Sequence, residues 1–117
     1  MRAPLLVLVV DDSDDQAQLL RRYLERSGCR VVVAESGEEA MSQLGELRPD
    51  IAVVDLLLPG ISGGDVAARV RETHPECFLV ITSVLDEARY PEADAVLPKP
   101  FTGEQVAHAV EQATRGG

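Results

Sequence analysis

The sequence predicts an α/β domain in which a parallel sheet is covered by helices on both faces. Short apolar runs, typical of strands buried on both faces, alternate along the chain with stretches of helical periodicity. Capping-box signatures, in which Ser or Thr is followed three residues later by Glu or Gln, mark the starts of three helical stretches. Strands that alternate with helices favour a parallel sheet. We expect residues 1–117 to form one domain, since this length suits a domain of ordinary size.

The first half of the chain supplies three of the predicted strands and two helices. The strands are the apolar runs Leu5–Val10, Val31–Ala34 and Ile51–Val54. Ser13 begins the first helix, with Gln16 as its capping-box partner, and Gly28 is a good helix stop. Ser36 and Glu39 form the second capping box, and Pro49-Asp50 ends the helical pattern before the third strand.

The second half continues the alternation after a turn-rich loop that contains Pro59-Gly60 and Gly63-Gly64. A third helix is predicted around Val66–Val70 and stops near His74. Thr102 and Gln105 form the third capping box, at the start of the last helix. The remaining predicted strands are Phe78–Ile81 and Ala95–Leu97, and the apolar stripe of the last helix is Val106, Ala109, Val110 and Ala113.

Composition and charge exclude several classes of function. The formal charge of −9 disfavours direct nucleic-acid binding, which relies on clustered Lys and Arg. No apolar stretch approaches the roughly 20 residues of a membrane span, and the start lacks the features of a signal peptide. We therefore expect a cytoplasmic protein that neither enters a membrane nor binds nucleic acid directly. Cys29 and Cys77 should be free thiols in that compartment.

Three aspartates stand at the ends of two predicted strands. Asp55 ends the run Ile51–Val54, while Asp11 and Asp12 end the run Leu5–Val10. If these strands are neighbours, three carboxylates share one pocket, and open α/β sheets bind ligands at the carboxyl ends of their strands. At about 5 Å and an effective dielectric near 20, each pair repels by roughly 3 kcal/mol. A divalent cation relieves this repulsion, and oxygen-only ligands favour Mg²⁺ or Mn²⁺.

Five short motifs together carry a resemblance to a known family. They are Val9-Val10-Asp11-Asp12, Val53-Val54-Asp55-Leu56, Pro59-Gly60 with Gly63 just after, Ile81-Thr82-Ser83, and Lys99-Pro100-Phe101. In this order the chain resembles the receiver domain of bacterial two-component response regulators over essentially its whole length. The resemblance implies a flavodoxin-like, doubly wound, five-stranded parallel sheet with strand order 2-1-3-4-5. That order places the first and third strands side by side at the switch point.

The resemblance also implies a metal site in the acidic pocket. Asp12 and Asp55 would bind Mg²⁺ directly, together with the backbone carbonyl of Leu57, and Mn²⁺ could substitute. Asp11 would act mainly through a bound water.

By the same resemblance, Asp55 is the phosphoacceptor. It would take a phosphoryl group from a histidine kinase or a histidine phosphotransfer protein, and the phosphorylated protein would switch its conformation or its partner binding. Lys99, the only lysine, would stabilise charge on the transferring oxygens, and Thr82 would turn its hydroxyl toward the bound phosphoryl group. In the family the Lys99-Pro100 bond is cis. The only chemistry implied is self-phosphotransfer and self-dephosphorylation, so the chain is not expected to be an enzyme, and its output partner is unknown.

Three features depart from the family pattern. Only sixteen residues separate Thr82 from Lys99, so the family's fourth helix is expected to be truncated or missing. Val96 stands where receivers usually carry Tyr or Phe, and nothing in the sequence argues that Tyr90 substitutes for it. Leu57 and Val84 are apolar at positions that flank the phosphoryl group in the family. We expect them to hinder an attacking water.

Two other classes of function remain open. The altered fourth-helix region allows an interaction module that works without phosphorylation. Asp12-Ser13-Asp14 resembles the Asp-x-Asp motif of haloacid-dehalogenase-type phosphatases, but 117 residues leave little room for their larger core and cap, and Asp55 would be unexplained. A flavin-binding module is disfavoured, because the acidic loop after Val10 would repel the flavin phosphate.

Overall fold

A computed structural model describes residues 4–116, and its strands form one parallel sheet in the order β2-β1-β3-β4-β5. The strands are β1 (Leu6–Val10), β2 (Arg30–Ala34), β3 (Ile51–Asp55), β4 (Phe78–Ser83) and β5 (Ala95–Pro98). The helices are α1 (Asp14–Arg26), α2 (Gly37–Glu46), α3 (Gly63–Thr73) and α4 (Gly103–Gly116). The predicted flavodoxin-like fold is confirmed, with β1 and β3 adjacent.

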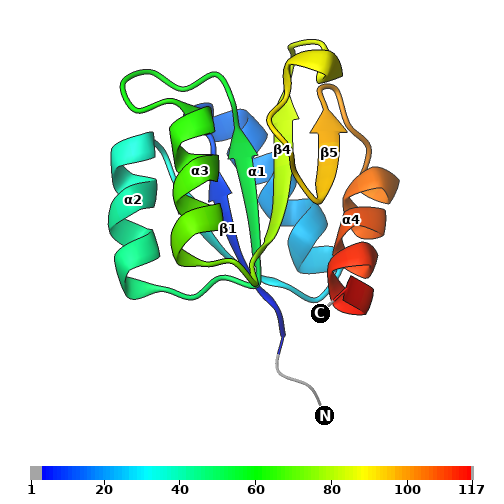
Figure 1. Ribbon diagram of the computed structural model, residues 1–117. Coiled ribbons are helices and arrows are strands. Elements are labelled where there is room, and N and C mark those ends of the chain that lie inside the picture. The colour runs from blue at the N-terminus through cyan, green and yellow to red at the C-terminus, as the bar shows by residue number, and fades with distance from the viewer. Residues whose placement is uncertain (1–3, 117) are drawn as a thin grey trace.

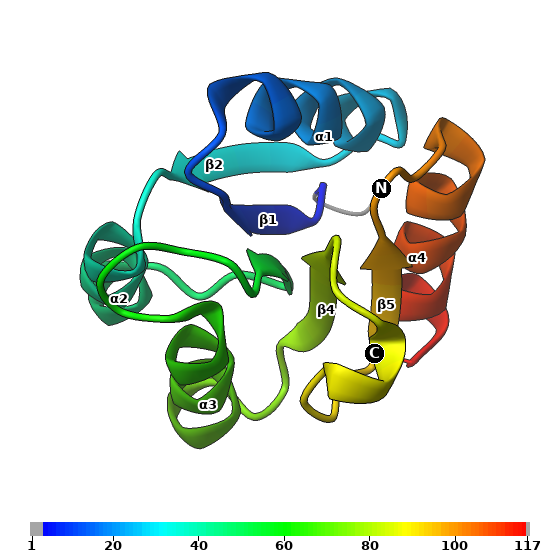
Figure 2. The ribbon, with the colours of Figure 1, turned by 90° about the horizontal axis from the view of Figure 1, so that it is seen from above.

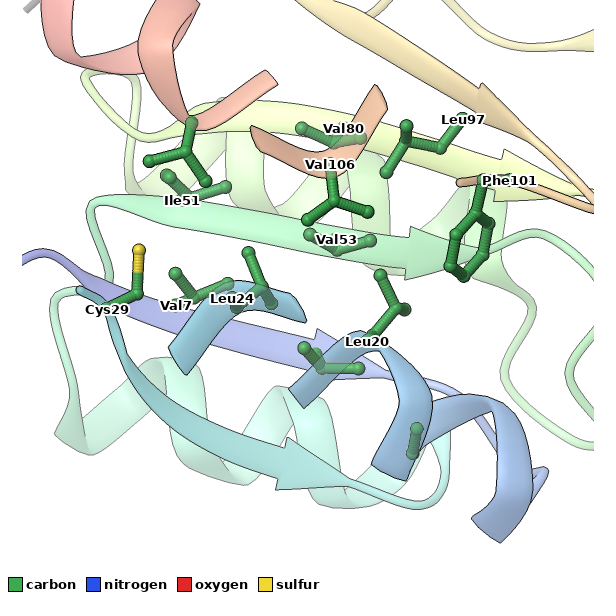
Figure 3. Packing of buried hydrophobic residues seen from close by; sticks show 13 residues of the cluster. Val7, Leu20, Leu24, Cys29, Ile51, Val53, Val80, Leu97, Phe101 and Val106 are labelled. Carbon is green, nitrogen blue, oxygen red and sulfur yellow. The ribbon is translucent and has the colours of Figure 1, made fainter. Parts of the chain in front are cut away.

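Helices cover both faces of the sheet, so that the central strands are buried on both sides. α1 and α4 lie on one face, and α2 and α3 lie on the other (Figures 1 and 2). Alternate residues of each strand point to opposite faces, which divides the core into two clusters. Val7 and Val53 belong to the α1/α4 cluster, where they lie near Leu20 of α1 and Val106 of α4 (Figure 3). Leu8 and Val54 belong to the α2/α3 cluster.

The two cysteines fall in different clusters. Cys29 belongs to the α1/α4 cluster and Cys77 to the α2/α3 cluster, so the sheet lies between them. Both thiols are free and buried. Burial raises the pKa of Cys77 to about 12, and the nearby carboxylates of Asp50 and Asp94 add to the shift. Neither cysteine therefore has the features of a reactive thiol.

One of the three predicted capping boxes forms in full. The hydroxyl of Thr102 accepts from the Gln105 N–H (3.2 Å), and the Gln105 side chain accepts from the Thr102 N–H (2.8 Å). At α2 the Ser36 hydroxyl accepts from the Glu39 N–H (3.0 Å), but the Glu39 carboxylate accepts from Glu35 instead of Ser36.

At α1 one of the two hydrogen bonds of the predicted capping box forms. The Ser13 hydroxyl accepts from the Gln16 N–H at 3.4 Å. The Ser13 N–H donates to the Asp11 carboxylate (2.9 Å), which takes the place of Gln16 as its acceptor. The start of α1 is thus tied to a residue of the acidic pocket.

The connection between β4 and β5 is short, as predicted from the sixteen-residue spacing. Between β4 and β5, where the family has its fourth helix, the chain forms one turn of 3-10 helix, η1 (Glu87–Arg89). Val96 of β5 points to the α2/α3 side of the sheet, because its neighbours Ala95 and Leu97 pack in the α1/α4 cluster. Without a full helix over it, Val96 is 40% exposed.

Within residues 4–116 the structure contains no helix with the length and apolar character of a membrane span.

Candidate functional site

The three predicted aspartates meet at the carboxyl edge of the sheet. Asp55 is the last residue of β3, and Asp11 and Asp12 directly follow β1. One carboxylate oxygen from each residue lies within 4.8 Å of the other two. Asp11 and Asp55 are 1% and 5% exposed, whereas Asp12 is exposed at the rim. The pairing of β1 with β3 brings these residues together from positions more than forty residues apart in the chain.

Backbone groups fix the two buried carboxylates. The Leu57 N–H donates to Asp55 Oδ1 (3.0 Å), and the Ser13 N–H donates to Asp11 Oδ1 (2.9 Å). The second oxygen of each aspartate faces into the pocket, where it meets Lys99. Both carboxylates are therefore held by the turn that follows their own strand.

Lys99 bridges the two buried aspartates. Its ammonium lies 2.9 Å from Asp55 Oδ2 and 3.2 Å from Asp11 Oδ2, and the Lys99-Pro100 bond is cis. Burial alone lowers the pKa of Lys99. The hydrogen bond and charge of Asp55, with those of Asp11, outweigh burial, so the pKa of Lys99 is raised. The lysine is thus firmly protonated at neutral pH and supplies positive charge to the pocket.

The pKa of the buried Asp11 carboxyl is raised above its usual value. Burial raises the pKa of Asp11, and the charge of Asp55 acts in the same direction. The Ser13 N–H and Lys99 oppose the shift without cancelling it. The Lys99 ammonium therefore does not fully compensate the negative charge of the pocket.

Thr82 lies at the end of β4, paired in register with Asp55. It is fully buried, and its hydroxyl donates to the Leu97 carbonyl of β5 at 2.7 Å. The sequence placed Thr82 at this edge correctly, but the acceptor of its hydroxyl depends on the neighbouring strand. A phosphoryl oxygen on Asp55 would have to compete with the Leu97 carbonyl for this donor.

The loop between β3 and α3 folds tightly back on Asp55. The Gly63 N–H donates to the Leu56 carbonyl (3.3 Å). A Cβ atom at Gly63 would lie only 2.0 Å from the Asp55 carbonyl oxygen, so only glycine fits there. Gly60 turns the loop with a φ of 72°, a left-handed conformation that favours glycine.

Two apolar residues that closely follow site residues in the sequence have exposed side chains. Leu57 is 49% exposed and Val84 is 68% exposed. Each lies two residues beyond a site residue, Asp55 in the first case and Thr82 in the second. The apolar border that these two residues would form around the site stays a prediction.

The pocket fits a small divalent cation of the Mg²⁺ type. Ligand oxygens on an octahedral Mg²⁺ lie at most about 4.2 Å apart, twice the Mg–O distance of about 2.1 Å. The three carboxylate oxygens lie within 4.8 Å of one another, close to this limit, so they gather in a space of the size that such an ion occupies. The donors are all oxygens, as hard cations prefer.

One contact at the site was not foreseen from the sequence. The Tyr90 hydroxyl donates to the Ser83 carbonyl (2.8 Å), beside Thr82. No spacing rule in the sequence links Tyr90 to β4 or to the position of Val96. The feature of the sequence that could have indicated this contact is the short connection between β4 and β5. A short connection keeps Tyr90, which directly follows η1, close to the sheet.

Comparison with known proteins identifies the family. The model of the response regulator receiver domain matches residues 7–111. The chain is 33% identical over 116 residues to the transcriptional regulatory protein AfsQ1 of Streptomyces coelicolor, covering 95% of this chain and 52% of that protein. It is 32% identical over 117 residues to a cyclic di-GMP phosphodiesterase of Thermotoga maritima, covering 95% of this chain and 31% of that protein. The chain thus spans only about a third to a half of these relatives.

A solved structure of a response regulator shows the same architecture. The response regulator protein TrrA of Thermotoga maritima, solved in complex with Mg²⁺ and a beryllium fluoride, superposes with a TM-score of 0.85 and 27% identity. The superposition covers 93% of this chain and 98% of that one. The chain belongs to the receiver domains of two-component response regulators.

Proposed function

We propose that this receiver domain is phosphorylated on Asp55 in a Mg²⁺-dependent reaction and acts as a switch in two-component signalling. The observation that carries the proposal is the bridge from Lys99 to Asp55 inside a cluster of three carboxylates. A buried nucleophile, a fixed cation and an oxygen-lined metal pocket are the parts that phosphoryl transfer requires. The donor would be a phosphohistidine of a kinase or of a phosphotransfer protein, and the site of action would be the cytoplasm.

Asp55 is suited to attack phosphorus because its carboxylate is held from two sides. The Leu57 N–H fixes Oδ1 and the Lys99 ammonium contacts Oδ2, while lone pairs remain free on both oxygens. As the new Asp55 O–P bond forms, the P–N bond to the donor histidine breaks in line with it. The leaving imidazole takes a proton from solvent. Lys99 offsets negative charge on the transferring oxygens, and Thr82 can donate to one of them after release of Leu97.

Asp12 and Asp55 would hold Mg²⁺ directly, with the Leu57 carbonyl, and Asp11 would bind through a water. The bound ion would neutralise charge on the pocket and on the phosphoryl oxygens. Mn²⁺ has similar ligand preferences and should replace it in the assay below.

The first test is labelling by acetyl phosphate. With Mg²⁺ present, intact-mass measurement should show one added phosphoryl group on the wild-type protein and none on Asp55→Ala. EDTA should prevent the labelling. An unlabelled wild-type protein, with acetyl phosphate and with a cognate kinase, would contradict the proposal and favour phosphorylation-independent binding. The short η1 connection and exposed Val96 are the observations that favour this second function.

The apolar border of the site predicts slow loss of the phosphoryl group. Leu57 and Val84 offer an attacking water no hydrogen bond, so Leu57→Asn and Val84→Glu should each speed decay. A hydrogen bond to a charged group contributes about 1.5–3 kcal/mol, which corresponds to an increase of about tenfold or more. Decay is measured by intact mass after removal of the donor.

The matched control for this prediction is Val96→Glu. Val96 is also an exposed valine, but it lies on β5 and does not follow Asp55 or Thr82. Its replacement should leave decay unchanged. If decay is the same in Leu57→Asn, Val84→Glu and the wild type, the border has no influence on hydrolysis.

A further inference from the structure

The Ser83 carbonyl at the end of β4 accepts hydrogen bonds from two separate parts of the chain. The Lys99 N–H donates to it at 2.9 Å, and the Tyr90 hydroxyl donates at 2.8 Å. A carbonyl oxygen has two lone pairs, so it can hold both donors. Lys99 makes this backbone contact just beyond β5, while its side chain reaches Asp11 and Asp55. One oxygen atom thus joins Tyr90 to the backbone of the site lysine.

Tyr90 is held on the sheet by packing as well as by its hydroxyl. Its ring lies partly buried against the α2/α3 cluster, on the side of the sheet to which Val96 points. The yellow segment around η1 lies beside β4 and β5 when viewed from above (Figure 2). A tyrosine with its ring on apolar side chains and its hydroxyl on a carbonyl is well fixed. Tyr90 is therefore one contact between this connection and the site end of β4; the Leu85 N–H, which donates to the Ser83 hydroxyl (3.2 Å), is another.

The other end of the connection is anchored away from the site. The Asp94 N–H donates to the Leu79 carbonyl (2.9 Å), and the Asp94 carboxylate accepts from the Leu79 N–H (2.8 Å). Arg71 of α3 contacts the same carboxylate at 3.2 Å. Asp94 is thus fixed near the start of β5, at the end of the strand opposite the site.

Phosphorylation would act on the same contacts between the neighbouring strands β4 and β5. The Thr82 hydroxyl now donates to the Leu97 carbonyl, and it must leave that acceptor to reach a phosphoryl oxygen on Asp55. Thr82 and Leu97 are in register, as are Ser83 and Pro98, which precedes Lys99. A change at Thr82 therefore occurs one residue from the carbonyl that Tyr90 holds.

We propose that Tyr90 is a positioning residue for phosphoryl transfer, acting through the Ser83 carbonyl on Lys99 and Thr82. Phosphorylation of Asp55 also changes the surroundings of this hydroxyl, and the change passes through Tyr90 to the connection between β4 and β5. Val96 cannot make such a link, because it has no hydrogen-bonding side chain. The inference rests on the proposed function of Asp55, since it concerns the regulation of that same site.

Kinetics of the Tyr90→Phe variant test the positioning role. The variant keeps the ring and loses one neutral hydrogen bond, so labelling by acetyl phosphate should slow by about fivefold. Its affinity for Mg²⁺, measured by titration, should match that of the wild type, because Tyr90 is not a proposed ligand. A merely structural role would leave the rate of labelling of the folded protein unchanged, and that result would overturn the inference.

Tyr23→Phe is the matched control. It also removes one phenol hydroxyl, but its ring packs edge-on against Phe101 with 6.4 Å between centroids, in the α1/α4 cluster. It should label at the wild-type rate. Equal slowing in both variants would mean that loss of any tyrosine hydroxyl slows the reaction, and it would count against a specific role of Tyr90.

Tyrosine fluorescence tests whether Tyr90 responds to phosphorylation of Asp55. The chain has no tryptophan and two tyrosines, so Tyr23→Phe leaves Tyr90 as the only strong emitter. Acetyl phosphate and Mg²⁺ are added, and emission and intact mass are followed on the same sample. Emission should change as the label appears and recover as it is lost. A labelled protein with constant emission overturns the inference and leaves the proposed function standing; absence of label contradicts both.

Discussion

Replacing Gly63 by alanine is expected to lower the free energy of unfolding by about 3 kcal/mol or more, the upper range for overpacking. The new Cβ would lie 2.0 Å from the Asp55 carbonyl oxygen and 2.6 Å from the Leu56 Cα. Both contacts are with backbone, so no side-chain rotation relieves them. A loss of this size is a large part of the 5–15 kcal/mol that stabilises a typical domain. Urea denaturation followed by circular dichroism measures it.

Gly64→Ala is the control for this prediction, since it makes the same change one residue later. A Cβ at Gly64 would meet only the Ser62 hydroxyl, at the ordinary contact distance of 3.6 Å. In a helix, alanine is favoured over glycine by up to about 1 kcal/mol, so this variant should be as stable as the wild type or slightly more stable. Equal stability of Gly63→Ala and Gly64→Ala would contradict the close packing of the start of α3 against the backbone of Asp55.

The second large effect is expected for Lys99→Met. Removing the ammonium takes away a cation that contacts both Asp11 and Asp55. Loss of a fixed group that stabilises transition-state charge slows an enzyme by about 10²–10³-fold, and labelling by acetyl phosphate should slow to a similar extent. Mg²⁺ should bind more tightly, because it no longer competes with the ammonium for the two carboxylates. Labelling kinetics and Mg²⁺ titration separate the two effects.

The raised pKa of Lys99 determines the pH range in which the Lys99→Met variant should be assayed. The stability that its ion pairs contribute is fully present below the usual pKa of 10.5 and is lost as pH rises through the higher folded value. An assay near neutral pH therefore compares a charged lysine with no charge at all.

Arg71→Met provides the matched loss of one positive charge. Arg71 pairs with Asp94 near the other end of β5, and both side chains are more than a third exposed. Exposed pairs of this kind contribute at most about 1 kcal/mol, so labelling and Mg²⁺ affinity should stay near wild type. Weaker Mg²⁺ binding in Lys99→Met would show that the lysine assists the metal and does not compete with it.

The sheet and the acidic pocket were predictable because they depend on local patterns. Continuous apolar runs are typical of strands buried on both faces, and the carboxyl ends of parallel strands share one edge. Asp11 and Asp55 could therefore be placed together once strand order was implied by the family. The short β4–β5 connection was predictable from the spacing of Thr82 and Lys99 alone.

Contacts between distant parts of the chain were not predictable in the same way. A hydroxyl rotates to whichever acceptor lies nearest, and the acceptor of Thr82 is a carbonyl fifteen residues away on β5. The contact of Lys99 with Asp11 and that of Tyr90 with Ser83 depend equally on how the strands pack. Even the local capping box at α2 changed its partner to Glu35, because a glutamate can reach either of two successive N–H groups.

The central claim is that Asp55 itself becomes phosphorylated, and the position of the label tests it most directly. An acyl phosphate is reduced by borohydride to the alcohol, which would convert a phosphorylated Asp55 to homoserine. The wild-type protein is labelled with acetyl phosphate and Mg²⁺, reduced, digested and mapped by mass spectrometry. We expect homoserine at position 55 and at no other aspartate. Homoserine at Asp11 or Asp12, or at no position in a protein that carries the label, would contradict the assignment of Asp55.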